Sequence, residues 1–147
     1  MKEVEAIMDA LKVNLQTIDD KVMFSAAARE NPQITIDFFP PIGTAKGYTS
    51  LELLMASFGS CLGTSLLTLL RYKMEKTVEG LSIEMDGRVR EEHPKALTHI
   101  VMVLKFKAKD LSEAEVLKAV KVSEEKICPV WSMLKGSVAV DIKTEIQ

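Results

Sequence analysis

The feature that most limits how this chain can fold is an uncharged stretch of 18 residues, from Leu53 to Leu70. As a helix it would be about 27 Å long, close to the thickness of the hydrocarbon core of a membrane. Its five Ser and Thr side chains and two glycines make it too polar for a membrane span. A capping box, Thr49 to Glu52, precedes it. The sequence therefore predicts a core helix that starts there, continues to about Met74 and is buried on most sides.

Length and charge narrow the class of protein further. The chain has 147 residues, enough for one core and too few for two ordinary domains, so we expect a single domain over residues 1–147. The net charge is −2, and Lys and Arg form no dense run with aromatic residues, which argues against nucleic acid and membrane surfaces as partners. Acids at Glu3 and Glu5 are unlike a secretory signal, so the expected location is cytoplasmic.

The remaining segments predict a mixed fold. Val4, Ile7, Met8 and Leu11 have helical spacing, so a short helix is expected over residues 3–11. A second capping box, Ser112 to Glu115, opens a helix that reaches towards Ile127, and a short helix follows from Pro129 to Lys135. Alternating apolar residues predict strands over residues 13–17, 22–26, 34–39, 81–85, 100–106 and 138–142. We therefore expect an α+β fold with two groups of antiparallel strands around the long helix.

Two cysteines are the first candidates for chemistry. Cys61 lies within the long helix beside small residues, and by itself it is also consistent with a buried cysteine that acts as a small hydrophobe. Cys128 precedes Pro129, which favours Cys128 as the N-cap of a short helix, where the helix dipole would lower the pKa of the thiol. An ordinary helix start explains Cys128 equally well. In a reducing compartment, any bond between the two would be reversible.

Other polar residues have simpler explanations. His93 and His99 flank a predicted surface turn, and no close pair of cysteines accompanies them, so we expect no metal site and no cofactor. Glu52 is explained by the capping box, although a catalytic role is compatible with it. Gly59 and Gly63, four residues apart on the long helix, would let a second helix or a partner chain approach closely.

Two segments carry a resemblance to a known family. Residues 50–61 (SLELLMASFGSC) resemble the first-cysteine helix of the OsmC/Ohr family, named for osmotically inducible protein C and organic hydroperoxide resistance. Residues 128–132 (CPVWS) resemble the second-cysteine motif of that family. The order of the predicted elements also agrees, so the resemblance extends over nearly the whole chain.

The resemblance implies an intertwined homodimer that reduces organic hydroperoxides. Cys61 would attack the peroxide and become a sulfenic acid, which condenses with Cys128 to a disulfide that a dithiol reductant then reduces. Glu52 and Arg29 would polarise the site, since the family uses a glutamate and an arginine from the N-terminal strands. Apolar residues near the thiol, Phe58 and Leu62, would favour an organic peroxide.

The chain departs from the family pattern at both polar positions. The better characterised members have a Pro-Glu pair one residue further from the cysteine, where this chain has Ser50-Leu51, and Arg29 lies nearer the helix than the family arginine. Arg71 is about 15 Å along the helix from Cys61 and is interpreted as a solvated charge. Two other classes therefore stay open: a non-catalytic module that binds a small apolar ligand, and a redox sensor that uses the same cysteines.

Overall fold

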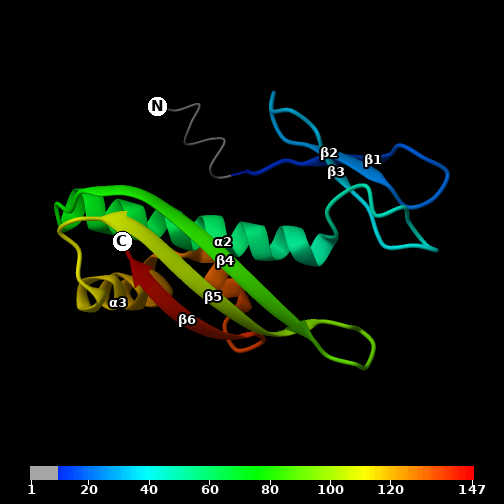
Figure 1. Ribbon diagram of the computed structural model, residues 1–147. Helices are drawn as coiled ribbons and strands as arrows, with labels where there is room; N and C mark the ends of the chain where they lie inside the picture. The colour runs from blue at the N-terminus through cyan, green and yellow to red at the C-terminus, as the bar shows by residue number, and fades with distance from the viewer. Residues whose placement is uncertain (1–9) are drawn as a thin grey trace. The chain divides into compact units, whose positions relative to one another are not determined.

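The structure, a computed structural model, describes residues 10–147 (Figure 1). They divide into two compact units, one that ends at Leu53 and one from Leu54 to Gln147, and each is described by itself. The helix predicted over residues 3–11 lies almost entirely outside the described residues, and its last two residues, Ala10 and Leu11, are not helical.

The first unit contains a small antiparallel sheet of three strands, in the order β1 (Asn14–Thr17), β2 (Phe24–Ala27) and β3 (Ile34–Ile36). The hairpin predicted between the first two strands is confirmed. Its turn is held by the side chain of Asp19, which accepts hydrogen bonds from two backbone N–H groups of the turn. Asp is common in turns because its carboxylate can accept such local bonds.

Strand β3 ends at Ile36, three residues earlier than predicted. The cause is Asp37, whose carboxylate accepts hydrogen bonds from the N–H of the next residue and from both the N–H and the hydroxyl of Thr44. These bonds turn the chain into a compact loop, so Phe38 and Phe39 leave the sheet. A side chain that bonds nearby backbone groups competes in this way with a strand ladder.

Helix α2 (Ser50–Thr68) begins at the predicted place and continues through a π-helical turn, η1 (Leu69–Lys73). The capping box is present, with Glu52 Oε1 accepting from the Thr49 N–H at 2.8 Å and Thr49 Oγ1 accepting from the Glu52 N–H at 3.2 Å. Along the second unit the helix is buried on one face and exposed on the other, where Ser57, Ser60, Thr64 and Thr68 lie. The prediction of burial on most sides was wrong for the single chain.

By length and composition alone, the continuous helix Ser50–Lys73 would be able to cross a membrane. This is weak evidence, because the core helix of a globular domain meets the same criteria. Here the large apolar residues Phe58, Leu62, Leu66 and Leu70 are fully buried in the core of the second unit. Packing against the protein itself therefore accounts for the apolar character of this face.

The second unit contains a sheet in the order β4 (Val78–Val89), β5 (Leu97–Ala108) and β6 (Ala139–Ile146). Strands β4 and β5 form the predicted antiparallel pair, each longer than predicted. Strand β6 pairs with β5 in parallel, so the expectation of only antiparallel strands was wrong.

The parallel pairing follows from the connection between β5 and β6. Helix α3 (Glu113–Val122), the π-helical turn η2 (Ser123–Ile127) and helix α4 (Pro129–Leu134) carry the chain back, so that β6 starts beside the beginning of β5. Parallel neighbours need such a crossover. The capping box at Ser112 and Glu115 is present as predicted.

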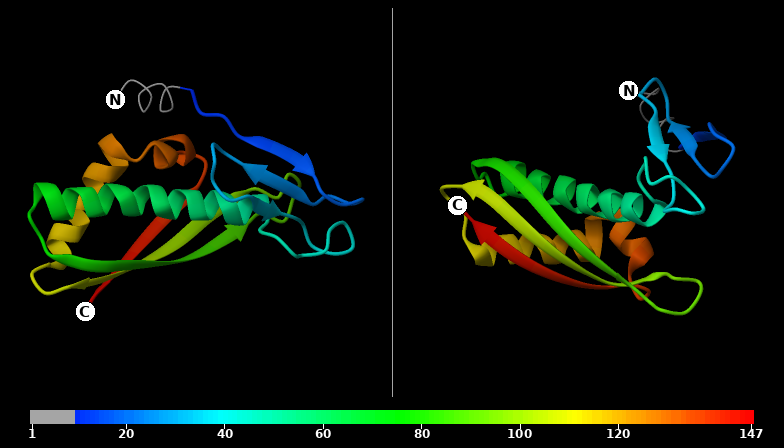
Figure 2. Two further views of the ribbon diagram at one scale, coloured as in Figure 1. Left: turned by 90° about the horizontal axis from the view of Figure 1, so that it is seen from above. Right: turned by 45° about the vertical axis from the view of Figure 1, so that its right-hand side comes forward.

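The helices of the second unit cover one face of its sheet (Figure 2). Alternate residues of β5 point into the core beneath α2 and α3, and all are nearly or fully buried: Ile100, Met102, Leu104 and Phe106. The opposite face is polar and carries ion pairs between neighbouring strands, among them Lys105 to Glu84 at 2.7 Å. The sheet thus has the single wet face that its alternation predicted.

Strand β4 is the element that approaches the two glycines of α2. A methyl group on Gly59 would lie 2.8 Å from the sulfur of Met85, and one on Gly63 would lie 3.3 Å from Ile83. The sequence predicted a second helix or a partner chain at this level. The glycines instead let the helix pack closely on the sheet of its own unit.

Candidate active site

Helix α2 presents Cys61 at the border of its buried and exposed faces. The side chain is half-buried, and its neighbours in sequence, Ser60 and Leu62, are exposed and fully buried respectively. The Cys61 carbonyl accepts a hydrogen bond from the hydroxyl of Ser65, one turn later. Cys61 is therefore held on a rigid helix and keeps partial access to solvent.

Cys128 lies where two helical segments meet. It ends the π-helical turn η2, with its N–H donating to the Ser123 carbonyl at 2.8 Å, and it is the N-cap of α4 with Pro129 at the first helical position. The N-cap position predicted from the Cys-Pro pair is confirmed. Its side chain is 2% exposed.

The fold brings the two sulfurs together across 67 positions of sequence. Cys61 Sγ and Cys128 Sγ are 3.2 Å apart, and both thiols are free. A disulfide bond is about 2.05 Å long, so an approach of roughly 1.2 Å would join the two sulfurs. The pair is therefore placed for reversible disulfide formation.

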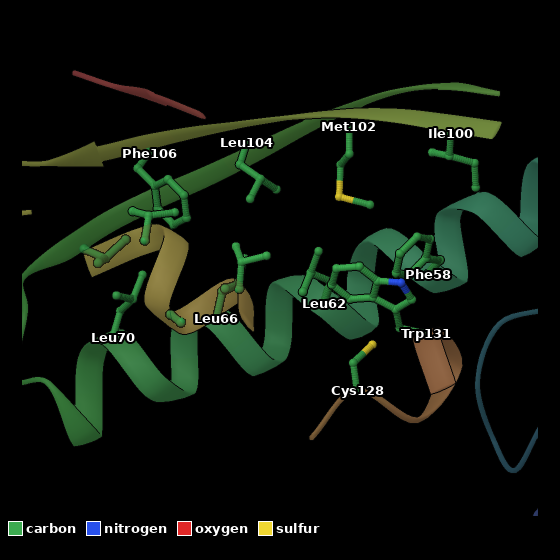
Figure 3. Close-up of a cluster of buried hydrophobic side chains, with 14 of the residues drawn as sticks. Phe58, Leu62, Leu66, Leu70, Ile100, Met102, Leu104, Phe106, Cys128 and Trp131 are labelled. Carbon is green, nitrogen blue, oxygen red and sulfur yellow. The ribbon is translucent and has the colours of Figure 1, made fainter. Parts of the chain in front are cut away.

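Aromatic packing fixes Cys128 against α2. The chain's only tryptophan, Trp131, lies one turn after Cys128, and its ring is 5.4 Å from the ring of Phe58, a distance typical of an aromatic pair. Figure 3 shows Cys128 and Trp131 side by side against the helix, next to Leu62. The sequence showed Trp131 within the CPVWS motif but gave no signal for this packing role.

Burial dominates the electrostatics of Cys128. Loss of solvation raises the pKa of its thiol to about 11, although the backbone N–H groups of Trp131 and Val130 act in the opposite direction. The hydrogen bond to Cys61 adds to the increase. The expectation that the N-cap position would lower this pKa was therefore wrong, because burial of a thiolate costs more than the short helix returns.

The predicted polar residues Glu52 and Arg29 belong to the first unit. Glu52 is explained by its capping box, and the hydrogen bonds from Thr49 lower the pKa of its carboxyl. Arg29 follows β2 with an exposed side chain and a positive φ of 56°. The structure thus shows the cysteine pair directly, while the catalytic roles of Glu52 and Arg29 stay predictions.

Three further residues have structural roles that the sequence did not show. Arg71 donates from Nε and Nη2 to the Val78 carbonyl, so it joins the end of the helix to β4 and is more than a solvated charge. Phe58 and Leu62 are fully buried in the core. They therefore do not line an open pocket for the tail of a peroxide, as the sequence had suggested.

Within residues 10–147, no group of three or more His, Cys, Asp or Glu side chains is placed to hold a metal ion. His99 Nε2 is 2.6 Å from Asp141 Oδ2 on the polar face of the sheet. One pair of this kind is too few for the three or four protein ligands of a typical zinc site.

A fold of two three-stranded sheets and a long helix is shared with known proteins. A family model described as "OsmC-like protein" matches residues 43–143. The chain belongs to the OsmC-like protein family. The resemblance found in the sequence is confirmed.

Individual relatives support this assignment. Protein YhfA of Escherichia coli K12 is 29% identical over 101 residues, which cover 69% of this chain and 75% of YhfA. The crystal structure of a hypothetical protein from Aquifex aeolicus VF5 is 30% identical, with a TM-score of 0.80, over 94% of this chain and 96% of that one. The organic hydroperoxide resistance protein OhrB of Bacillus subtilis is 18% identical, with a TM-score of 0.64, over 92% and 98% of the chains. At that identity, OhrB shows a common fold alone.

Proposed function

We propose that this protein is a thiol peroxidase that reduces organic hydroperoxides in the cytoplasm, as part of the defence against oxidative stress. The observation that carries the proposal is the 3.2 Å separation of the Cys61 and Cys128 sulfurs. The similarity of the fold to an organic hydroperoxide resistance protein supports the choice of substrate class.

The exposure of the two cysteine side chains assigns the attacking and the resolving role. Cys61 is half-buried on the surface-facing edge of α2, whereas Cys128 is buried behind it. A peroxide therefore reaches Cys61 first. The Cys61 thiolate attacks the hydroxyl oxygen of the peroxide, the O–O bond breaks, and the alkoxide that leaves takes a proton from water to become an alcohol. The sulfenic acid that forms condenses with Cys128 to a disulfide and water. A dithiol reductant returns both thiols by exchange.

The proposal includes a homodimer. The first unit exposes large apolar side chains, with Val13, Leu15, Phe39 and Ile42 all more than half exposed in the single chain. The exposed face of α2 carries small hydroxyl side chains that already bond to carbonyls of their own helix, among them Thr64 to Ser60 and Thr68 to Thr64. Such surfaces favour a protein partner, and a second copy is the partner that the family resemblance implies.

A single-turnover experiment tests the activity. The reduced protein is mixed with one equivalent of cumene hydroperoxide, and free thiols are counted over time. We expect wild type to lose two thiols and form one disulfide within the chain. Cys128→Ser should lose its remaining thiol and accumulate a sulfenic acid that a dimedone probe traps.

Cys61→Ser is the matched control, since it keeps a thiol at the buried position. Loss of thiol at the wild-type rate in Cys61→Ser, or no loss in wild type, would contradict the proposal. Clean disulfide formation with very slow turnover under excess dithiol reductant would instead favour the redox sensor.

A further inference from the structure

The hydrogen bond between the two sulfurs has a direction that burial decides. At a separation of 3.2 Å, one thiol donates a hydrogen bond to the other sulfur. Cys128 is 2% exposed and Cys61 is half-buried. Because a thiolate that is cut off from water loses its solvation, the more buried thiol keeps its proton. Cys128 is therefore the donor of this hydrogen bond, and the Cys61 sulfur is the acceptor.

The surroundings of Cys128 agree with this direction. The Cys128 sulfur has Cys61 of helix α2 as its hydrogen-bond partner. The core residues beside Cys128 in Figure 3, Trp131 and Leu62, present apolar atoms to it. Glu124, Glu125 and Lys126 of its own segment line a shallow hollow, and Cys128 is part of the same lining. Burial raises the pKa of the Cys128 thiol to about 11, so the proton stays on this sulfur at neutral pH.

We propose that the Cys128 thiol is the proton donor of the site: its S–H stabilises the Cys61 thiolate in the reduced protein, and the same proton leaves with the hydroxyl of the sulfenic acid when the disulfide forms. The first half of this proposal needs no peroxide. The second half rests on the proposed peroxidase function. A thiol that donates a hydrogen bond to a thiolate acts as an internal substitute for part of the charge that an arginine would provide.

The chemistry balances without a further reagent. In the condensation step, the Cys128 sulfur forms a bond to the Cys61 sulfur while the S–O bond of the sulfenic acid breaks. The oxygen departs with its own hydrogen and the proton of Cys128, as water. Both sulfurs end at the disulfide oxidation state, and the peroxide is the oxidant that was consumed one step earlier. No free Cys128 thiolate needs to form in the buried position.

The first test measures alkylation of Cys61 by iodoacetamide from pH 5 to pH 10, followed by peptide mass analysis. The quantity compared is the rate at pH 7 divided by the plateau rate at high pH, because this ratio cancels changes in access. We expect Cys128→Ala to lower the ratio by about tenfold to a hundredfold, the effect of one hydrogen bond to a charged group. Cys128→Ser keeps a donor and should retain most of the wild-type ratio.

Two results would overturn the first half. The ratio in Cys128→Ala could equal that of wild type, in which case the S–H does not stabilise the thiolate. The ratio in Cys128→Ser could fall as far as in Cys128→Ala, in which case the space filled by sulfur matters and the proton does not. Circular dichroism and Trp131 fluorescence check that both variants are folded.

An infrared measurement on the wild-type protein covers the case in which the variants unfold. After Cys61 has ionised, one S–H stretching band should remain, at a lower frequency than that of a free thiol because it donates a hydrogen bond. The band should be absent from Cys128→Ser and present in Cys61→Ser. A remaining band that belongs to Cys61 would reverse the direction of the bond and end the proposal.

The second half is tested by the pH dependence of disulfide formation after a pulse of cumene hydroperoxide. If Cys128 passes its proton directly to the leaving hydroxyl, the rate of condensation should be flat between pH 6 and pH 8. If Cys128 had to ionise first, the rate would rise tenfold for each pH unit.

The alkylation ratio and the pH dependence of disulfide formation distinguish a failure of the peroxidase proposal from a failure of the role given to Cys128. A protein that does not react with peroxide gives no condensation step and contradicts the peroxidase proposal, while the alkylation ratio still decides whether Cys128 stabilises the Cys61 thiolate. A normal reaction with a tenfold rise per pH unit contradicts only the proton transfer.

Discussion

Asp37 shows how one carboxylate shapes the loop that follows the first sheet. Its side chain is 4% exposed, and its oxygens accept hydrogen bonds from the N–H of Phe38, from the N–H and hydroxyl of Thr44 and from the N–H of Lys46. These donors lower the pKa of Asp37 to about 2, with the Thr44 hydroxyl the largest contributor. The loop therefore depends on an ionised carboxylate.

The prediction for Asp37 concerns acid. Because its folded-state pKa lies below the unfolded value, its contribution to stability is complete above about pH 4 and disappears as the pH falls towards 2. We expect Asp37→Asn to be less stable than wild type at pH 7, with the difference shrinking as the solution is acidified. Urea unfolding at pH 7, 4 and 2.5, followed by circular dichroism, measures this difference.

The control for this measurement is Asp20→Asn, which changes an exposed carboxylate of the neighbouring hairpin. It should leave the pH dependence of wild type intact. A stability difference between wild type and Asp37→Asn that stays constant down to pH 2.5 would contradict the role given to the charge.

At the scale of residues, the sequence predicted the participants better than their environments. Cys61 and Cys128 were identified from two motifs, and the structure places their sulfurs together. The pKa direction of Cys128 was predicted wrongly, because local sequence shows the cap and conceals the burial that outweighs it. Phe58 was assigned to a pocket for the same reason, since its burial depends on a strand about 40 residues away.

At the scale of secondary-structure elements, a reciprocal pair of hydrogen bonds caps the start of helix α3. Ser112 Oγ accepts from the Glu115 N–H at 3.3 Å, and Glu115 Oε2 accepts from the Ser112 N–H at 2.9 Å. The same glutamate forms an ion pair with Lys76, which follows the end of η1. One side chain thus helps to start a helix and to attach it to the neighbouring segment.

Removing the N-cap of α3 should lower the stability of the protein moderately. We expect Ser112→Ala to lower the free energy of unfolding by about 1 kcal/mol, the usual effect of losing an N-cap hydroxyl. Urea unfolding followed by Trp131 fluorescence reports on this unit. Ser137→Ala, an exposed serine outside any helix, is the matched control and should be near neutral. Equal losses in the two variants would show that the cap does not stabilise the helix.

Elements with local signals were predicted well, and those set by distant contacts were not. Both capping boxes and the Cys-Pro helix start are visible in a few consecutive residues, and all three are present. The parallel pairing of β6 depends on where a crossover of about 30 residues delivers the chain, which no local pattern encodes.

The whole molecule is divided between a small sheet with few buried residues and a larger unit with a continuous core. The buried residues of the first unit are mostly small or polar, among them Ser25, Ala26 and Asp37, whereas the second unit buries large side chains from α2, β5 and α3. Burial of apolar surface is the main source of folding free energy. The second unit therefore holds the site rigidly, and the first has the most to gain from a partner chain.

Oxidation should stabilise this second unit. A disulfide between Cys61 and Cys128 would close a loop of 67 positions, which runs from α2 through β4, β5 and α3 to the start of α4. A disulfide typically stabilises the folded state by about 2–4 kcal/mol, mainly because it restricts the unfolded chain. We expect the oxidised protein to unfold at a correspondingly higher urea concentration than the reduced protein, when both are compared at one protein concentration because association also affects stability.

The variant Cys61→Ser, treated with oxidant in parallel, controls for damage elsewhere and should show no gain. A gain in wild type requires that the two sulfurs can close the remaining distance without distorting α2 or α4. If oxidised wild type were less stable than the reduced form, the disulfide would strain the helices that carry the two cysteines. Formation of the disulfide would then be unfavourable. Equal or greater stability after oxidation is the behaviour that a reversible thiol cycle on a rigid helix requires.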